Sequence, residues 1–298
     1  PHSRVNKHKA QSFVEITGER GLEFVHEENE YDDFERELLL PAKHSNHGPA
    51  MAVGDVNGDG HQDLYVGGAA GFEGYLFMQN FKGEFSMVEV NEWAQDKNCE
   101  DVDAVFFDAD NDSDLDLYVV SGGNEFMANS NNLQDRLYLN NGKGVFKKSL
   151  RSLPEMLSSG SCVKPADYDQ DGDLDLFVGG RVIPGKYPFS PRSYLLENKN
   201  GIFTDVTESN SNNISSIGMV TDAVWINNSE EGYPDLILVG EWMPITYFSN
   251  DNGVLTSVDY PGFKESAGWW NCIEAADFDG DGDLDLIAGN LGTNSKYA

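Results

Sequence analysis

An aspartate-rich segment recurs five times along this chain of 298 residues, and each copy runs directly into a short apolar stretch. The copies begin at Asp55, Asp108, Asp167, Asn227 and Asp277, so their starts are separated by about 50 to 60 residues. A four-stranded propeller blade takes about 40 to 50 residues in the common families, and longer loops account for the difference. The interval therefore predicts a β-propeller in which each repeat is one blade.

The four complete copies carry oxygen-bearing side chains at positions 1, 3, 5 and 9, and a polar residue at position 7. Hard cations such as Ca²⁺ prefer carboxylate and amide oxygens. Carboxylates packed this closely repel one another by about 4 kcal/mol per pair at an effective dielectric of 20, so we expect the loops to need cations. The predicted Ca²⁺ ligands are Asp55, Asn57, Asp59, His61, Asp63, Asp108, Asp110, Asp112, Asp114, Asp116, Asp167, Asp169, Asp171, Asp173, Asp175, Asp277, Asp279, Asp281, Asp283 and Asp285.

Two copies depart from the pattern. The fourth, which runs from Asn227 to Asp235, keeps only two carboxylates, and Glu231 is one methylene too long for a tight position 5. We predict that this loop is empty or weakly occupied when the other four are filled. In the second copy Ser113 replaces the turn glycine, at a cost of about 1 kcal/mol if the position needs a positive φ. Its carboxylates are complete, so binding is still expected there.

Position 12 decides which kind of calcium loop this is. An EF-hand needs a bidentate glutamate at that position, followed by a helix. The complete copies have Val66, Val119, Val178 and Ala288 there and continue as strand formers, which excludes EF-hand and dockerin interpretations. The long interval also excludes a calcium β-roll, whose repeat is about nine residues. A calcium loop within a β-hairpin fits.

A second signature follows each of the first three loops by half a repeat, at residues 76–85, 137–146 and 195–203. These segments alternate apolar and polar residues, turn at Asn or Gly, and resume with an aromatic residue, which is typical of a hairpin. Each blade is therefore predicted as strand A, calcium loop, strand B, connector, and an outer hairpin of strands C and D.

Composition narrows the class of partner. The formal net charge of −31 stays strongly negative even with four Ca²⁺ bound, which argues against nucleic acid as a partner. With 39% hydrophobic residues the chain can bury a core, but it has no run long enough for a membrane helix and no signal segment. We expect a processed or excised piece of a soluble protein without direct membrane insertion. Cys99, Cys162 and Cys272 are too few for a disulfide framework and are expected to be buried free thiols.

On these motifs the chain resembles the FG-GAP/VCBS repeat family, calcium-loop propellers that are also found in integrin α-subunit heads. The D-x-D-x-D-G-D-L-D-L strings and the Val-Gly-Gly endings at Val66 and Val178 carry the resemblance, over residues 48–297. Residues 48–55 and 137–142 also resemble large surface proteins of Bacteroidetes. The resemblance implies an all-β propeller of about seven four-stranded antiparallel blades. It further implies an extracytoplasmic setting, at the cell surface or in the periplasm, associated with the outer membrane.

The repeats suggest a division of the chain. Residues 1–45 are expected to hold the end of a preceding blade and a connector, and residues 46–298 five repeats, the last incomplete. The A–B hairpins are expected near residues 48–66, 101–120, 160–178, 219–239 and 269–288. Because Phe13–Thr17 resembles Phe203–Thr207, it is expected to be the last strand of a blade. It either closes the ring by completing the last blade or shows that the chain is a fragment of a larger propeller, which we favour.

Hairpin geometry locates a second surface of interest. Because the calcium loop joins strands A and B at one end of the blade, the start of A and the end of B lie together at the opposite end. Polar, charged and tryptophan residues occur at these positions. The candidates for a ligand-binding face are Asp101, Asp103, Asn124, Glu125, Arg181, Lys186, Glu241, Trp242, Trp270 and Asn271. Trp225, Trp242, Trp269 and Trp270 either pack between blades or serve as aromatic platforms for a ligand.

Three functions are compatible with this pattern. The first is a non-catalytic binding or adhesion module, in which structural Ca²⁺ holds the blades and the opposite face recognises a glycan or a protein. The second is a carbohydrate-active enzyme, a polysaccharide lyase or hydrolase, with Asp101, Asp103, Glu125 and Glu241 as its carboxylates. The third is a structural subunit of an outer-membrane uptake or assembly complex. Because H-E-x-x-H and G-x-S-x-G motifs are absent, we do not expect an enzyme.

Overall fold

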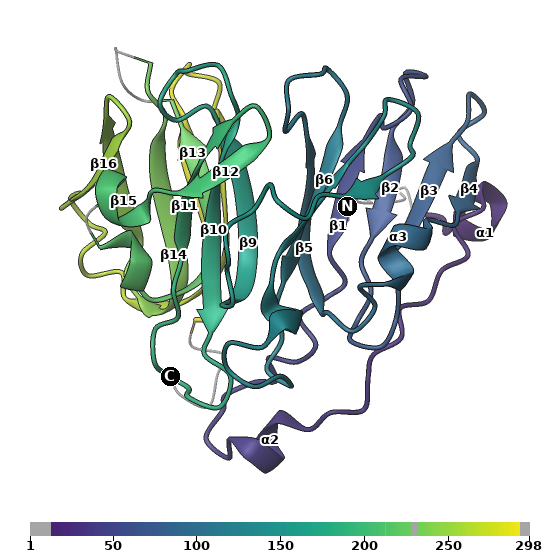
Figure 1. Cartoon of the computed structure of the whole chain (residues 1–298). Helices are drawn as coiled ribbons and strands as arrows, with labels where there is room; N and C mark the ends of the chain where they lie inside the picture. The colour runs from purple at the N-terminus through teal and green to yellow at the C-terminus, as the bar shows by residue number, and fades with distance from the viewer. Residues whose placement is uncertain (1–12, 212, 228–231, 293–298) are drawn as a thin grey trace, which may run out of the picture.

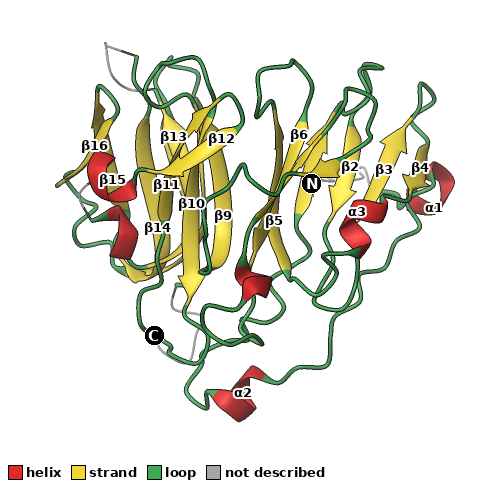
Figure 2. Cartoon of the chain, in the orientation of Figure 1, coloured by secondary structure: helices red, strands yellow, loops and turns green. Residues whose placement is uncertain are grey.

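The computed structural model describes residues 13–211, 213–227 and 232–292. Three four-stranded antiparallel sheets and one six-stranded sheet, which consists of a four-stranded unit and a further hairpin, stand side by side (Figures 1 and 2). We number these units as blades I to V. Blade I is β1 (Met51–Gly54), β2 (Asp63–Val66), β3 (Tyr75–Gln79) and β4 (Phe85–Val88). Blade II is β5 (Asp101–Phe107), β6 (Asp116–Ser121), β7 (Arg136–Leu139) and β8 (Lys147–Lys148).

Blade III is β9 (Ser159–Ala166), β10 (Asp175–Val182), β11 (Tyr194–Lys199) and β12 (Ile202–Asp205). Blade IV is β13 (Met219–Ile226), β14 (Asp235–Met243), β15 (Thr246–Asp251) and β16 (Val254–Val258). Blade V is the hairpin of β17 (Gly268–Ala276) and β18 (Asp285–Asn290). Two residue pairs, Glu241 with Trp269 and Met243 with Gly268, join β14 to β17. The blades of four antiparallel strands predicted from the sequence are thus confirmed.

The remaining elements are short. They are α1 (Thr17–Arg20), α2 (Asp33–Arg36), α3 (Asn91–Ala94), α4 (Thr207–Asn210) and two 3₁₀ turns at Asn131–Leu133 and Ile214–Ser216. Among the described residues, no helix has the length and apolar character required to cross a bilayer.

Strand order within each blade places the first strand innermost. Within blades II, III and IV each strand pairs with the next in sequence, and the first strands β1, β5, β9, β13 and β17 lie next to one another from blade to blade. Each Asp-rich loop joins the first strand of its blade to the second. All these loops therefore lie at one end of the molecule, the upper end in Figure 1.

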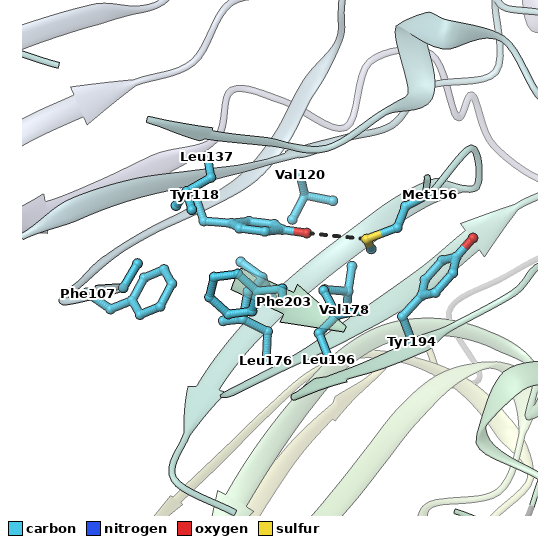
Figure 3. Packing of buried hydrophobic residues seen from close by; sticks show 12 residues of the cluster. Phe107, Tyr118, Val120, Leu137, Met156, Leu176, Val178, Tyr194, Leu196 and Phe203 are labelled. Carbon is cyan, nitrogen blue, oxygen red and sulfur yellow. Dashed lines mark hydrogen bonds between the residues drawn. The ribbon is translucent and has the colours of Figure 1, made fainter. Parts of the chain in front are cut away.

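The hydrophobic core lies between blades rather than within them. Figure 3 shows the cluster between blades II and III, in which Phe107 and Tyr118 face Leu176 and Phe203. Similar clusters fill the spaces between blades I and II, III and IV, and IV and V. Burying one such side chain contributes about 1.5–3 kcal/mol, so each blade depends on its neighbours for stability.

A repeated asparagine ties each blade to the one before it. Asn198 in β11 donates two hydrogen bonds from Nδ2, one to the Leu174 carbonyl of its own blade and one to the Ala109 carbonyl in the loop of blade II. The equivalent donors are Asn140, which reaches Leu115 and Val56, and Asn250, which reaches Pro234 and Tyr168. The asparagine of the predicted turn signature therefore connects neighbouring blades, and we call it the inter-blade asparagine.

The aspartate at position 9 has a structural role in every blade with a complete third strand. The two oxygens of Asp175 accept hydrogen bonds from the backbone N–H groups of Tyr168 and Asn198, which fixes the loop to β11. Asp63 and Asp116 make the same pair of bonds in blades I and II. Asp235, in the degenerate fourth copy, keeps the bond to Asn250. This residue therefore fastens the hairpin whether or not its loop holds a metal.

Two expectations about local structure were wrong. Phe13–Thr17 forms no strand: residues 13–16 lie outside any element, Phe13 is fully exposed, and Thr17 begins α1. A strand needs a partner for its backbone groups, and none lies beside this segment among the described residues. Instead Arg20 at the end of α1 donates to the Lys82 carbonyl, so the segment lies beside blade I and does not complete blade V (Figure 1).

Cys99 and Cys162 are buried free thiols as expected, but Cys272 is exposed on β17.

The buried carboxylate of Asp135 makes the stability of blade II dependent on pH. This carboxylate accepts hydrogen bonds from the Ser121 N–H and the Tyr118 hydroxyl, but burial raises its pKa to about 7. A raised carboxyl pKa gives stability that is present below the unfolded-state pKa and is lost as pH rises through the folded-state value, here from about pH 4 to 7.

We therefore expect Asp135→Asn to gain stability relative to wild type between pH 5 and pH 8, by up to about 3 kcal/mol. Urea unfolding of both proteins across this range measures the difference. Asp251→Asn, an exposed aspartate of β15, is the control and should track wild type. Parallel curves for Asp135→Asn and wild type would contradict the expectation.

Candidate calcium loops and the face opposite them

In three of the loops, the carboxylates at positions 1, 3 and 9 converge. One oxygen from each of Asp108, Asp110 and Asp116 lies within 4.8 Å of the other two, and the same holds for Asp167, Asp169 and Asp175, and for Asp277, Asp279 and Asp285. The first loop has Asn57 at position 3, so its oxygen donors are not all carboxylates. Oxygens at these separations can surround one hard cation.

Positions 5 and 7 play a different part in the loop. The carboxylates of Asp59, Asp112, Asp171 and Asp281 each accept the backbone N–H of position 7, which closes the turn. The position 7 side chain of Asp173 accepts bonds from Asn111 in the loop of blade II and from the Asn200 N–H. His61, Asp114 and Asp283 stand at the same position in their loops. The predicted ligands at positions 5 and 7 lie outside the three convergent triads.

The turn at position 6 requires a positive φ. Gly172 adopts φ 96° and Gly282 φ 98°, and Ser113 adopts φ 73° in the second loop. A side chain in this region costs about 1 kcal/mol, so the condition attached to the Ser113 prediction is met. The second loop keeps the convergent triad despite this cost.

The negative charge of the carboxylates in these loops is not neutralised by cationic side chains of the described residues. The buried Oδ1 atoms of Asp110, Asp114 and Asp167 have no hydrogen-bond partner. Burial and the neighbouring carboxylate of Asp169 raise the pKa of Asp175 to about 8, and burial with the charges of Asp110 and Asp114 raises that of Asp116 to about 7. A divalent cation would supply the missing positive charge, and the oxygen-only donor set suits Ca²⁺. The residues therefore fit the ion.

The fourth loop is only partly visible. Ser229 and Glu231 lie outside the described residues, and Asn227 is exposed. The carboxylate of Asp235 accepts hydrogen bonds from the Asn250 N–H and the Tyr247 hydroxyl. Weak occupancy of this loop stays a prediction.

At the opposite end, several ligand-face candidates are engaged inside the protein. Asp101 pairs with the buried Arg136 at 2.6 Å and accepts the Tyr65 hydroxyl at 2.8 Å. Asp103 accepts the Val163 N–H of blade III, and burial raises its pKa to about 6. Arg181 and Glu241 form a buried ion pair at 2.5 Å between blades III and IV. Their contacts join neighbouring blades.

A segment of the chain itself crosses this end of the molecule. We call residues 23–47, which contain α2 and run beneath the blades in Figure 1, the strap. Its Arg36 donates to the carbonyls of Asn124 and Phe126, and its Glu37 accepts the Asn124 amide and the Tyr187 N–H. Asn124 is fully buried as a result. No pattern in the sequence predicted these contacts.

Other candidates remain accessible. Asn271 is exposed and lines a cavity of about 240 Å³ near the inner strands, together with His47, Thr221 and the buried Arg181. Lys186 is exposed at a larger cavity of about 550 Å³, where Arg192 lies over the ring of Tyr194 at 5.1 Å. Trp270 is partly buried and its Nε1 donates to the Ser266 carbonyl. Glu125 is partly buried.

The tryptophans lie in two different environments. Trp225 packs between blades, stacked on Tyr168 at 6.1 Å and hydrogen-bonded to the Lys164 carbonyl. Trp242 at the end of β14 is 56% exposed, with φ 59°. Its ring lies 5.0 Å from that of Trp269, and its Nε1 donates to the Tyr187 hydroxyl at 2.6 Å.

Blades of four antiparallel strands with Asp-rich loops between the first and second strands define a propeller repeat of the Asp-rich-loop type. FG-GAP-like repeats match residues 55–119, 108–178 and 231–288, which together make up more than half of the chain. The protein belongs to the FG-GAP-like repeat family.

Several solved structures are similar to this chain at low sequence identity. An Agrocybe aegerita lectin that recognises non-reducing terminal N-acetylglucosamine is 18% identical, with a TM-score of 0.47 over 80% of this chain and 56% of its own. The Vibrio cholerae biofilm matrix protein Bap1 is 16% identical, with a TM-score of 0.40 over 81% and 34%. The Dos1 propeller is 11% identical, with a TM-score of 0.42 over 74% and 61%. The chain thus spans 34 to 61% of these structures. No protein of curated function matches the sequence.

Proposed function

We propose that this protein is a non-catalytic, extracytoplasmic binding module that recognises a glycan or protein partner at the end opposite its calcium loops. Millimolar extracellular calcium suits loops of this kind, because extracellular calcium modules bind with dissociation constants of about 10⁻⁴ to 10⁻³ M. Bound ions hold the hairpins, and the connectors at the other end present the contact groups.

Trp242 is the observation that carries this proposal. A tryptophan with φ 59° carries a backbone cost of about 1–2 kcal/mol, and more than half of its surface faces solvent. Neither feature stabilises the fold. The Tyr187 hydroxyl and the Trp269 ring nevertheless fix the indole in one orientation. A rigid, exposed aromatic platform beside polar groups is suited to stacking on a sugar ring or anchoring a protein loop.

The carboxylates support a binding role rather than catalysis. Asp101 and Glu241 are buried in ion pairs with Arg136 and Arg181, and Asp103 accepts a backbone N–H. A general acid or base has to reach a substrate proton, and these three carboxylates are committed to contacts between blades.

The test compares Trp242→Ala with Phe81→Ala on a glycan array and in affinity capture of surface proteins, with calcium and with chelator. Phe81 is a matched control because it is 79% exposed in the β3–β4 turn, at the calcium-loop end. We expect wild type and Phe81→Ala to bind equally, and Trp242→Ala to lose binding at least about tenfold while its stability stays within about 1 kcal/mol. Equal binding by Trp242→Ala, or cleavage of the captured glycan, would overturn the proposal.

A further inference from the structure

A second group of acidic residues lies beneath the blades, at the end away from the Asp-rich loops. Glu100 directly precedes β5, and Glu125 follows β6. The backbone pairs the two segments, because the Gly122 N–H donates to the Glu100 carbonyl. The negative charge of Glu28, a residue of the strap, acts on both carboxylates, and that of Asp33, also in the strap, acts on Glu125. Acidic residues from three separate segments therefore act on the same region.

Glu100 is buried without a charge partner. Its residue is 0% exposed; Oε2 accepts the Ala70 N–H at 2.8 Å, and Oε1 has no hydrogen-bond partner. Both carboxylate oxygens of Glu125 are also buried, and the donors that act on them are the backbone N–H groups of Asn124 and of Glu125 itself. No ion pair involves either carboxylate among residues 13–211, 213–227 and 232–292. Two buried carboxylates are thus left without a cationic partner, which is costly unless a cation or proton joins them.

The nearest cationic side chain is directed elsewhere. Arg36 of the strap donates Nη1 to the carbonyls of Asn124 and Phe126, on either side of Glu125, and not to its carboxylate. Burial, with the neighbouring charges of Glu125 and Glu28, raises the pKa of Glu100 to about 9. His26 is engaged with Glu28 at 2.9 Å. The local charge is therefore negative and uncompensated by the protein's own groups.

We propose that Glu100 and Glu125 bind a hard divalent cation of the Ca²⁺ class, at a site distinct from the Asp-rich loops, and that this ion fastens the strap to blade II. Unpaired carboxylate oxygens are the ligands such an ion prefers, and Glu28 and Asp33 strengthen the field that attracts it. The inference does not depend on the proposed binding function, because it concerns how the strap is held.

The experiment counts bound calcium per chain by native mass spectrometry in wild type, the Glu100→Gln/Glu125→Gln double variant and Glu35→Gln. Glu35 is a matched control, an exposed glutamate of α2 on the same strap. The double variant should bind one Ca²⁺ fewer than wild type and Glu35→Gln. Because Gln imitates a protonated glutamate, an unchanged count would show that a proton occupies Glu100 instead, and would overturn the proposal.

Limited trypsin digestion in saturating calcium gives an independent readout. The strap contains Arg36 and Lys43, and loss of the ion should speed cleavage at these residues by at least about tenfold in the double variant. If the double variant does not fold, Glu125→Gln alone is used, since this residue is only partly buried. That variant should weaken one calcium site by about tenfold or more. Unchanged affinity and unchanged cleavage in Glu125→Gln would also overturn the proposal.

Discussion

Removal of calcium by excess chelator should lower the melting temperature more than any single substitution. A ligand that binds only the folded state stabilises it by about 2.7 kcal/mol at a concentration 100 times its dissociation constant. Several such loops act together, so their combined contribution is comparable to the total stability of a typical domain, about 5–15 kcal/mol. The convergent carboxylates of the second, third and fifth loops then repel one another without compensation.

A single change separates ion binding from other effects of chelation. Asp167→Asn keeps the side-chain shape of position 1 in the third loop but removes a charge and places an amide where the unpartnered Oδ1 stands. In about 10 mM calcium, which is about 100 times a dissociation constant of 10⁻⁴ M, we expect the variant to lose about 2–3 kcal/mol of stability. In chelator the variant should be as stable as wild type or more stable, because the substitution relieves the repulsion of position 1 with Asp169 and Asp175.

Differential scanning calorimetry in both buffers checks this expectation. Asp251→Asn, which removes one exposed carboxylate outside the loops, should match wild type in each buffer. If Asp167→Asn lost the same stability with and without calcium, the loop would be held by hydrogen bonds alone and no ion would be involved.

Asn198→Ala should destabilise the protein by about 3–5 kcal/mol, although no ligand or charge is removed. The side chain is 1% exposed and makes three hydrogen bonds, to the carbonyls of Ala109 and Leu174 and from the Gly201 N–H. Truncation leaves all three backbone groups buried and unsatisfied, at a cost of about 1–3 kcal/mol each, which relaxation partly offsets. Chemical denaturation of the calcium-loaded protein measures the loss.

The matched control is Asn141→Ala. This residue follows Asn140, the inter-blade asparagine of blade II. Asn141 is exposed, and its side chain accepts only the Lys143 N–H within its own turn. It should cost less than about 1 kcal/mol. Equal effects of the two substitutions would mean that the asparagines stabilise their turns and do not connect the blades.

The hairpins and their loops could be predicted because their signals are local. Ligands at positions 1, 3 and 9 lie within nine residues of one another, and position 12 distinguishes this loop from an EF-hand. The strands themselves follow from alternation and from turn residues at Asn and Gly. The prediction for Phe13–Thr17 failed because strand formation depends on a partner, which a local match to Phe203–Thr207 does not supply.

The opposite face was harder to predict because its contacts are long-range. The Arg36–Asn124 hydrogen bond joins residues 88 positions apart, and the Glu37–Tyr187 bond joins residues 150 apart. No periodicity relates such positions, so the strap gave no signal in the sequence. Polar residues expected to meet a ligand, such as Asn124 and Arg181, were correctly placed at that end but are largely engaged within the protein.

The sequence by itself determined the repeat and the position of each Asp-rich loop, and it predicted Ca²⁺ as the ion, because oxygen donors a few residues apart must meet in a short turn. Only the tertiary structure decided which of the polar groups at the other end stay accessible. At that end the side chain of Trp242 is exposed to solvent, whereas Arg181 and Glu241 form a buried ion pair. Burial and pairing depend on which blades and segments pack together, and that packing is a property of the whole chain.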